Sequence, residues 1–309
     1  MTDTAPLFVS SGDLIADRRY GFALELAARG DLPAAADILE QTVALAPKFA
    51  AAWCALGDMR ERLGDVAQAI AAYGRARDVD PEDYYGARLH LGRLGAADAV
   101  PAMTQTYVRT LFDQYAARYD EALTVKLGYR GPALLRAAVD AVRGGARFGA
   151  MLDLGCGTGL AGAAFRPLVG RLTGVDLSAA MIAKAEAKGI YDRLVCADLA
   201  AFLAEEIAAA ARYDLVVAAD VFVYLGDLVP IVAAVARVLA HGSLFAFTVE
   251  THAGDGVTLL PTLRYAHGKP YVRAALGDAG LAVARLDAAA VRSEKGVPVA
   301  SLVVVASRA

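Results

Sequence analysis

The sequence predicts a doubly wound α/β domain that follows a shorter, all-helical region. Two observations support this prediction. From about residue 150 to the end of the 309-residue chain, strand-like apolar runs alternate with helix-like segments, which is typical of a doubly wound sheet. Residues 1–100, in contrast, carry only helical signals, and these recur with a period of about 34 residues.

The helical region contains two copies of one sequence pattern. The second copy consists of Trp53, Leu56, Gly57, Ala69, Tyr73, Ala76 and Pro81. The equivalent positions of the first copy hold Phe22, Ala23, Ala35, Leu39 and Pro47. The pattern resembles the tetratricopeptide repeat, in which small residues let two antiparallel helices pack closely and a proline ends the second helix. An alanine-rich bundle without repeat geometry is the alternative interpretation.

The role of residues 1–100 is less defined than their helical character. A third helix near Tyr84–Leu94 matches the pattern only in part, and we interpret it as a cap on the open end of the repeats. Repeats of this kind bind partners, but arrays usually need about three units for stability. We therefore expect this domain to pack on the rest of the chain or on a second copy of itself, and a protein partner stays open.

Residues 101–309 are expected to form the second domain, with lid helices in residues 101–148. Gly95–Pro101 marks the junction. In the predicted helix Thr104–Asp120, one apolar stripe recurs at helical spacing, formed by Val108, Leu111, Phe112, Tyr115 and Tyr119. Packing against the core explains such a stripe, but the hydroxyl groups of Tyr115 and Tyr119 also suit a lid over a polar ligand.

The strands of the second domain are predicted from continuous apolar runs, which suit a parallel strand covered on both faces. They are Ala150–Leu154, Arg171–Val175, Arg193–Ala197, Tyr213–Ala219, Ser243–Val249, Leu281–Leu286 and Ala300–Ala306. No helix separates the last two, so they must be antiparallel to each other. The sequence thus predicts seven strands, of which the last runs antiparallel.

A glycine-rich turn follows the first of these strands. Gly155, Gly157 and Gly159 permit positive φ angles and the close approach of a ligand, and the helix after them offers unpaired N–H groups. Asp176, at the end of the second strand, is placed to bind a ribose diol. A nicotinamide-binding loop would have glycine where Leu160 stands. The turn therefore predicts another nucleoside-containing cofactor, unless its glycines are purely structural.

Four acidic residues end successive strands: Asp153, Asp176, Asp198 and Asp220. The spacing D-x-G-x-G-x-G from Asp153 to Gly159 resembles the first motif of class I S-adenosylmethionine (SAM) dependent methyltransferases. The helix segment Leu177–Ile182 is similar to the one that follows the second acid in that family. With the repeats, the chain resembles the bacterial tetratricopeptide-repeat methyltransferases. It departs from them at Ala240–Ser243, where the family usually has Pro-Gly-Gly.

The resemblance implies a Rossmann-like, seven-stranded methyltransferase sheet, SAM as cofactor and S-adenosylhomocysteine (SAH) as product. The cofactor-binding residues that it implies are Asp153, Gly155, Gly157, Gly159, Asp176, Leu177, Met181, Asp198, Leu199 and Asp220, with Tyr115 and Tyr119 from the lid. The expected reaction is in-line methyl transfer to oxygen or nitrogen of a small metabolite. Where that acceptor needs a base, Glu250 and His267 are candidates. A solvated strand end and a surface histidine are their simpler interpretations.

The acceptor itself is not specified by the sequence. A protein methyltransferase that captures its client with the repeats is one alternative, and a SAM-binding scaffold without catalysis is another. Net charge of −3, with both signs interspersed, argues against nucleic acid. The Asp220–Val223 segment also lacks the motifs of DNA methyltransferases.

Composition and residue spacing bear on membrane spans, cellular location and metal binding. We expect no membrane span, because no uninterrupted apolar run reaches about 18 residues. The N-terminal segment lacks the order of a signal peptide, so we expect a cytoplasmic protein. No metal site is indicated by the spacing of the residues that could bind one, Cys54, Cys156, Cys196, His90, His241, His252 and His267.

Overall fold

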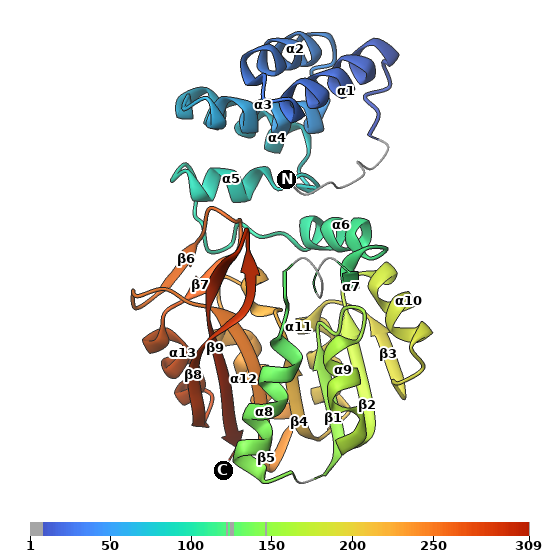
Figure 1. The fold of residues 1–309 in the computed structure, drawn as a ribbon, viewed down its shortest axis with the longest axis vertical. Helices are drawn as coiled ribbons and strands as arrows, with labels where there is room; N and C mark the ends of the chain where they lie inside the picture. Colours follow the sequence, from blue (N-terminus) through green and yellow to red (C-terminus); the bar gives the residue numbers. More distant parts are fainter. Residues whose placement is uncertain (1–8, 122, 124–126, 146, 309) are drawn as a thin grey trace. The chain divides into compact units, whose positions relative to one another are not determined.

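The computed structural model describes residues 9–121, 123, 127–145 and 147–308 (Figure 1). The chain divides into two compact units, here called the helical unit and the sheet unit. The helical unit comprises Met1–Tyr107 and Pro261–Leu263, and the sheet unit comprises Val108–Leu260 and Arg264–Ala309. Residues 1–8, on which the expectation about a signal peptide depends, lie outside the described residues. So do residues 122, 124–126 and 146 of the expected lid region.

Two helical hairpins and one further helix make up most of the described helical unit. Its helices are α1 (Leu14–Ala28), α2 (Leu32–Leu45), α3 (Ala50–Arg62), α4 (Val66–Val79) and α5 (Ala87–Arg93). The turns of the two hairpins are built alike. Gly30 and Gly64 have φ of +89° and +84°, and the next residues, Asp31 and Asp65, accept backbone N–H groups of the helices that they precede.

Small residues bring the two helices of the second hairpin into close contact. A Cβ atom at Gly57 of α3 would lie 2.6 Å from the ring of Tyr73 on α4. Tyr73 is fully buried, and so is Ala23, which holds the position equivalent to Gly57 in the first hairpin. The helical character of this region is thus confirmed. The third expected helix, near Tyr84–Leu94, is α5.

The sheet unit combines helices and strands in alternation. Its helices are α6 (Gln105–Tyr115, which begins in the helical unit), α7 (Tyr119–Glu121), α8 (Gly131–Arg143), α9 (Leu160–Phe165), α10 (Ala179–Ala187), α11 (Leu199–Ala208), α12 (Val229–Val238) and α13 (Lys269–Asp278). Its strands are β1 (Phe148–Leu154), β2 (Val169–Asp176), β3 (Arg193–Cys196), β4 (Tyr213–Ala218), β5 (Leu239–Glu250), β6 (Val257–Leu259), β7 (Tyr265–His267), β8 (Leu281–Glu294) and β9 (Val297–Arg308).

Within the described residues, nine strands form one mixed sheet. Strands β3, β2, β1, β4 and β5 lie side by side and parallel. Strand β9 pairs antiparallel with both β5 and β8, so the predicted antiparallel last strand is confirmed. The order β3-β2-β1-β4-β5-β9-β8 therefore accounts for all seven predicted strands. It places the ends of β2, β1, β4 and β5 in a row along one edge of the sheet.

Three sequence predictions need correction. The short strands β6 and β7, three residues each, were not expected, because so few residues give no recognisable alternation. Strands β8 and β9 extend to 14 and 12 residues, so most of the loop predicted between them is strand. The single helix predicted for Thr104–Asp120 is broken by a turn at residues 116–118, where Ala116 is buried.

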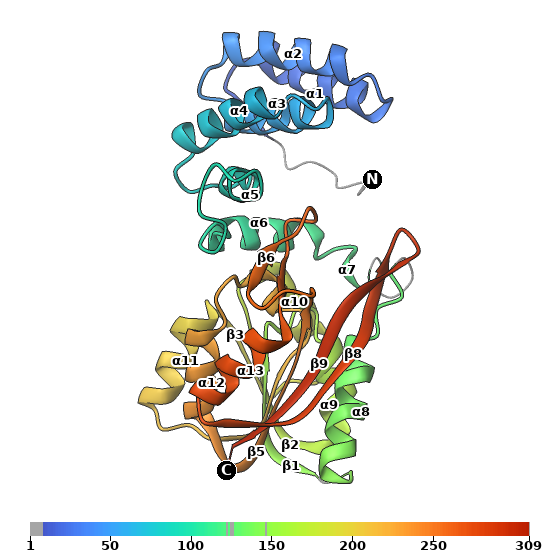
Figure 2. The same ribbon diagram turned by 90° about the vertical axis from the view of Figure 1, so that its left-hand side faces the viewer.

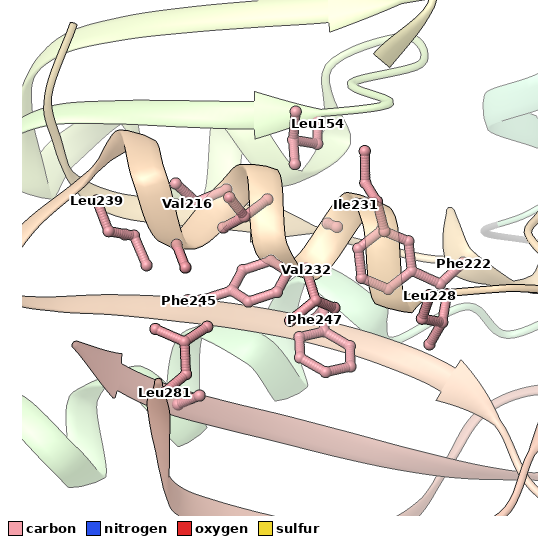
Figure 3. Packing of buried hydrophobic residues seen from close by; sticks show 14 of the residues in the cluster. Leu154, Val216, Phe222, Leu228, Ile231, Val232, Leu239, Phe245, Phe247 and Leu281 are labelled. Atoms are coloured by element: carbon pink, nitrogen blue, oxygen red, sulfur yellow. The ribbon is translucent and has the colours of Figure 1, made fainter. Parts of the chain in front are cut away.

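Helices cover both faces of the sheet (Figure 2). Helices α8 and α9 pack on one face, against Met151, Leu215 and Ala246. Helices α11, α12 and α13 pack on the other. There, Val232 of α12 lies against Phe245 and Phe247 of β5 (Figure 3). Because neighbouring residues of β5 face opposite sides, its central residues Leu244–Phe247 are all apolar, as a strand buried on both faces requires. Among the described residues, no helix has both the length and the apolar character needed to cross a membrane.

Candidate active site

The three glycines form a loop at the carboxyl end of β1. Gly155, Gly157 and Gly159 have φ of +62°, +52° and +92°, values that glycine adopts readily. A Cβ atom at Gly155 would lie 2.6 Å from Val221, so the loop packs against the segment after β4. At Gly157, a Cβ atom would meet the ring of Tyr119 at 3.8 Å. The glycine loop is therefore compact on one side and covered by Tyr119 at its middle.

Asp176 ties the end of β2 to this loop. Its Oδ2 accepts the backbone N–H of Gly157 at 2.8 Å, and its Oδ1 accepts that of Ser178 at 2.9 Å. Burial raises the pKa of Asp176, although these hydrogen bonds act in the opposite direction. The carboxylate thus lies beside the glycine loop, as a ribose-binding acid would.

Asp153 lies beneath the loop. Its side chain is fully buried, and its Oδ2 accepts the hydroxyl hydrogen of Tyr191 at 2.6 Å. The Tyr191 side chain fits against three glycines: a Cβ atom would lie 3.0 Å from its ring at Gly159, 2.2 Å from its hydroxyl oxygen at Gly162 and 2.7 Å from its ring at Gly174. Burial raises the pKa of Asp153 to about 7, against the lowering effect of the Tyr191 hydrogen bond. The hydrogen-bonded pair of Asp153 and Tyr191 therefore supports the glycine loop on its buried side.

The segment Val108–Glu121, here called the lid segment, is attached to the loop by side chains. Asp120 accepts hydrogen bonds from Thr158 Oγ1 within the loop and, at 2.9 Å, from Lys188 Nζ. Asp113 of α6 accepts one from Ser178 Oγ, next to Asp176. Tyr119 lies between these two attachments. Tyr115 is half-buried, and among the described residues no ring contact or hydrogen bond joins its side chain to the loop.

A buried ionic cluster occupies the carboxyl ends of β4 and β5. Arg292 of β8, with a side chain 1% exposed, donates Nη1 to Asp220 Oδ1 at 2.6 Å and Nη2 to Glu250 Oε1. Glu294 accepts from Arg292 Nε at 3.3 Å and from Arg264 Nη1 at 2.6 Å. Arg264 also lies 3.7 Å from Glu250. Burial raises the pKa of Glu250, while the two guanidinium groups oppose that change.

Tyrosine side chains connect this cluster to the lid segment. Burial raises the pKa of Tyr119 well above its usual value, and the charges of Asp220 and Asp176 add to the effect. Burial and Asp220 act in the same way on the pKa of Tyr129. The ring of Tyr224 lies 5.1 Å from that of Phe112 on α6. Tyr119 is thus near both acids that flank the loop.

The other expected cofactor residues have mainly structural contacts. Asp198 begins α11, and its side chain accepts the backbone N–H groups of Ala200 and Ala201 at 2.9 and 3.0 Å. Leu177 and Leu199, which follow Asp176 and Asp198, are half-buried. Met181 of α10 is fully buried.

His267 lies on β7 and is fully buried. Its Nε2 lies 2.9 Å from the carbonyl oxygen of Leu225, so the neutral ring donates its N–H there. Its Nδ1 has no hydrogen-bond partner among the described residues. Burial lowers the pKa of His267 to about 4. The imidazole is therefore neutral at pH 7, and its N–H donates a hydrogen bond to a backbone carbonyl.

The structure thus gathers the glycine loop, Asp176, Tyr119, Asp220 and Glu250 around one region of the sheet edge. Sequence reasoning missed Arg264, Arg292, Tyr129 and Tyr191. Tyr224 belongs to the segment after Asp220 that the sequence analysis already singled out. Arg292 had no signal of its own, because it falls where a loop was predicted. Among the described residues, no group of three or more His, Cys, Asp or Glu side chains is arranged to hold a metal ion.

Comparison with known proteins shows what kind of domain this is. Residues 152–245 match the family model described as a methyltransferase domain. This range runs from β1 into β5 and contains the glycine loop, Asp176, Asp198 and Asp220. Human methyltransferase-like protein 27 is 38% identical to this chain over 104 residues, which are 32% of this chain and 40% of the human protein. The match therefore spans less than half of that relative.

Two solved structures have the same fold as the sheet unit. A magnesium protoporphyrin IX methyltransferase from Synechocystis PCC 6803 with bound SAH shares 18% identity, covering 66% of this chain and 99% of its own, with a TM-score of 0.51. The 1,6-didemethyltoxoflavin N1-methyltransferase of Burkholderia thailandensis shares 19% identity, covering 65% and 88%, also with a TM-score of 0.51. At these identities the likeness shows the fold alone.

Proposed function

We propose that this chain, which carries a methyltransferase domain with a Rossmann-like fold, transfers the methyl group of SAM to oxygen or nitrogen of a small molecule. SAM is the cofactor, and SAH is the product. The observation that supports this proposal most directly is the joint placement of Asp176 and the glycine loop. Both lie at the carboxyl ends of adjacent parallel strands, where open α/β sheets bind their ligands.

The residues present fit such a cofactor. Each oxygen of Asp176 accepts one backbone N–H, and each has a second lone pair that a ribose hydroxyl could use. On the side where a Cβ atom of Gly157 would point, the described atom that it would meet belongs to the Tyr119 ring, so a ligand that reaches the loop there must share this space with Tyr119 or displace it. We therefore propose that Tyr119 lies over the cofactor, with the lid segment shifting as it binds.

From the strand order we infer a position for the acceptor. Strands β2, β1, β4 and β5 are neighbours, so Asp176, the glycine loop, Asp220 and Glu250 follow one another along the sheet edge. A cofactor with its ribose at Asp176 would extend across the loop toward Asp220. The acceptor then belongs at the ends of β4 and β5, near Glu250.

The chemistry requires little beyond binding and orientation. A sulfonium methyl group is already activated, so the protein must hold the acceptor atom in line, about 3 Å away, and exclude water. The half-buried side chains of Tyr119 and Tyr129 serve the second need. Where the acceptor must lose a proton, Glu250 is the better candidate, because it ends β5 at the sheet edge, whereas burial lowers the pKa of His267 to about 4 and makes it a weak base.

Calorimetric titration with SAM, SAH and NAD tests the cofactor assignment. We expect SAM and SAH to bind and NAD not to bind. Replacing Asp176 by alanine should weaken SAM binding by roughly 2–4 kcal/mol, or tens- to hundreds-fold, through the loss of charge-assisted hydrogen bonds. Asp192→Ala is the matched control: Asp192 accepts the N–H of Leu172 on the same strand β2, but it precedes β3 and is far from the carboxyl end. Equal affinity in Asp176→Ala and the wild-type protein would contradict the role of Asp176.

A groove in the helical unit favours a second candidate. We propose that the two hairpins are tetratricopeptide repeats, and the groove between their helices has a volume of about 620 Å³, with Trp53, Leu56, Arg60 and Arg75 in its wall. This groove would suit a protein client. Incubating labelled SAM with cell extract divided at about 3 kDa separates the alternatives. Label in the small fraction supports a metabolite and label in the large fraction supports a protein. Binding without labelling of either fraction supports a scaffold.

A further inference from the structure

A single buried arginine joins the acids at the ends of β4 and β5. Arg292 contacts Asp220 with Nη1 and Glu250 with Nη2, so one planar guanidinium sets the distance and orientation between the two carboxylates. An ammonium group is a point charge on a flexible stem and cannot fix two partners in this way. The arrangement is therefore specific to arginine.

A bulge in β8 orients the side chain of Arg292. The pairing of β8 with β9 shifts register between Ala290 and Ser293, so Val291 and Arg292 have no partner on β9. The two residues beside Arg292 also form backbone hydrogen bonds outside the β8–β9 hairpin. Val291 O accepts the N–H of Arg130 at 2.8 Å, and Ser293 donates its N–H to Leu127 O at 2.8 Å. Bulges of this kind redirect a side chain, often beside an active site.

Stability alone does not explain such a cluster. Removing an arginine and its acids from water costs several kcal/mol per ion, and well-packed apolar residues often replace buried ion pairs without loss. Arg292, Asp220 and Glu250 are all buried or nearly so. Their position at the ends of β4 and β5 is also where the acceptor was placed above. A role in the reaction accounts for both observations.

We infer that Arg292 is a positioning residue of the methyl-transfer site: it orients Asp220 and Glu250 and offsets their negative charge beside the sulfonium. This inference rests on the proposed function. It also connects the reaction to the segment before α8, because Leu127 and Arg130 hold the strand on both sides of Arg292. The role is distinct from that of Glu250, which would contact the acceptor itself.

The ratio of SAM to SAH affinity provides a test that a purely structural role would not affect. The two ligands differ by a methyl group and by the positive charge on sulfur. Without the guanidinium, Asp220 and Glu250 would leave more negative charge near the sulfur, which favours SAM. We expect Arg292→Met to raise the preference for SAM over SAH by roughly three- to tenfold in calorimetry. Arg292→Lys keeps the charge and should stay within about twofold of the wild-type ratio.

Arg193→Met is the matched control, because Arg193 pairs at 2.6 Å with the buried Glu206, between β3 and α11. Its ratio should equal that of the wild-type protein. Where Arg292→Met does not fold, Arg292→Gln removes the positive charge but keeps an amide that can donate to the two acids, so the ratio should again rise. An unchanged ratio in the folded variant, or an equal shift in Arg193→Met, overturns the inference. Failure of the wild-type protein to bind SAM or SAH overturns the proposed function instead.

Discussion

At the scale of single residues, Asp153 shows how position and role can differ. The sequence places it at the head of the glycine motif, and the structure buries it completely beneath the loop. One oxygen accepts the Tyr191 hydroxyl, while Oδ1 has no partner among the described residues. An ionised carboxylate in this environment is costly, which is why the pKa rises to about 7.

This pKa shift predicts how stability depends on pH. A carboxyl group whose pKa is raised from 3.8 to about 7 binds its proton more tightly in the folded state. Asp153 therefore lowers the free energy of unfolding as pH rises from about 4 to 7. Between pH 5 and pH 8 the loss should be about 2–3 kcal/mol. Urea unfolding at both pH values should show a smaller decrease in Asp153→Asn, which stays neutral, than in the wild-type protein. Parallel decreases would contradict the shifted pKa.

The acids also show what a sequence can and cannot predict for a site. Asp176, Asp198 and Asp220 were placed at strand ends from apolar runs and spacing, and the structure agrees with that placement. The sequence did not predict which group each carboxylate contacts. Asp198 caps a helix and Asp220 meets Arg292, which is 72 positions away in the sequence. The contact of Asp220 depends on the bulge in β8, and a bulge leaves no periodic signal.

At the scale of secondary structure elements, the lid segment Val108–Glu121 is the part most directly coupled to a ligand. Its polar attachments include those of Asp113 to Ser178 and of Asp120 to Thr158 and Lys188. Helix α6 contains no buried residue, and a segment with little buried surface opens more easily than a core helix. We expect SAH to slow hydrogen exchange across this segment, measured by mass spectrometry with and without ligand. Exchange in α12, whose inner face is buried in the core, serves as the internal control. Equal exchange in the lid segment would argue against its role as a lid.

The glycine in α9 allows a second test at this scale. Replacing a helical glycine by alanine usually stabilises a protein by up to about 1 kcal/mol. At Gly162 the new Cβ atom would lie 2.2 Å from the Tyr191 hydroxyl, which is held by Asp153. Gly162→Ala should therefore lower the melting temperature. In Gly277→Ala, on α13, nothing lies within 4 Å of the new atom, and the melting temperature should rise or stay unchanged. A stabilised Gly162→Ala variant would show that the Tyr191 ring can move without cost.

The sequence predicted some secondary structure elements more accurately than others. The core strands β1, β2, β4 and β5 were recognisable because burial on both faces demands continuous apolar runs. The outer part of the β8–β9 hairpin was not, because its residues are mostly exposed and follow no apolar pattern. The turn after α6 was missed for a related reason: the stripe that ends at Tyr119 keeps helical spacing although the helix itself stops at Tyr115.

At the scale of the whole molecule, the candidate site and the groove belong to different units. Every contact that builds the site joins residues of the sheet unit: Gly157 with Asp176, Asp120 with Thr158, and Arg292 with Asp220 and Glu250. The groove around Trp53 lies within the helical unit. The proposed cofactor binding and the proposed recognition of a partner would thus belong to different units.

This separation predicts the behaviour of a shortened protein. A fragment comprising residues 102–309 keeps the glycine loop, Asp176, the lid segment and the ionic cluster, so its affinity for SAM should stay within a few-fold of the full-length value in calorimetry. Its stability or its turnover should decrease, because the repeats would otherwise contribute to oligomerisation or to access of the substrate. A folded fragment that binds SAM more than tenfold more weakly would show that the helical unit takes part in cofactor binding. A fragment that is stable and fully active would instead identify the repeats as a separate docking arm and weaken the protein-client alternative, since turnover would not need the groove.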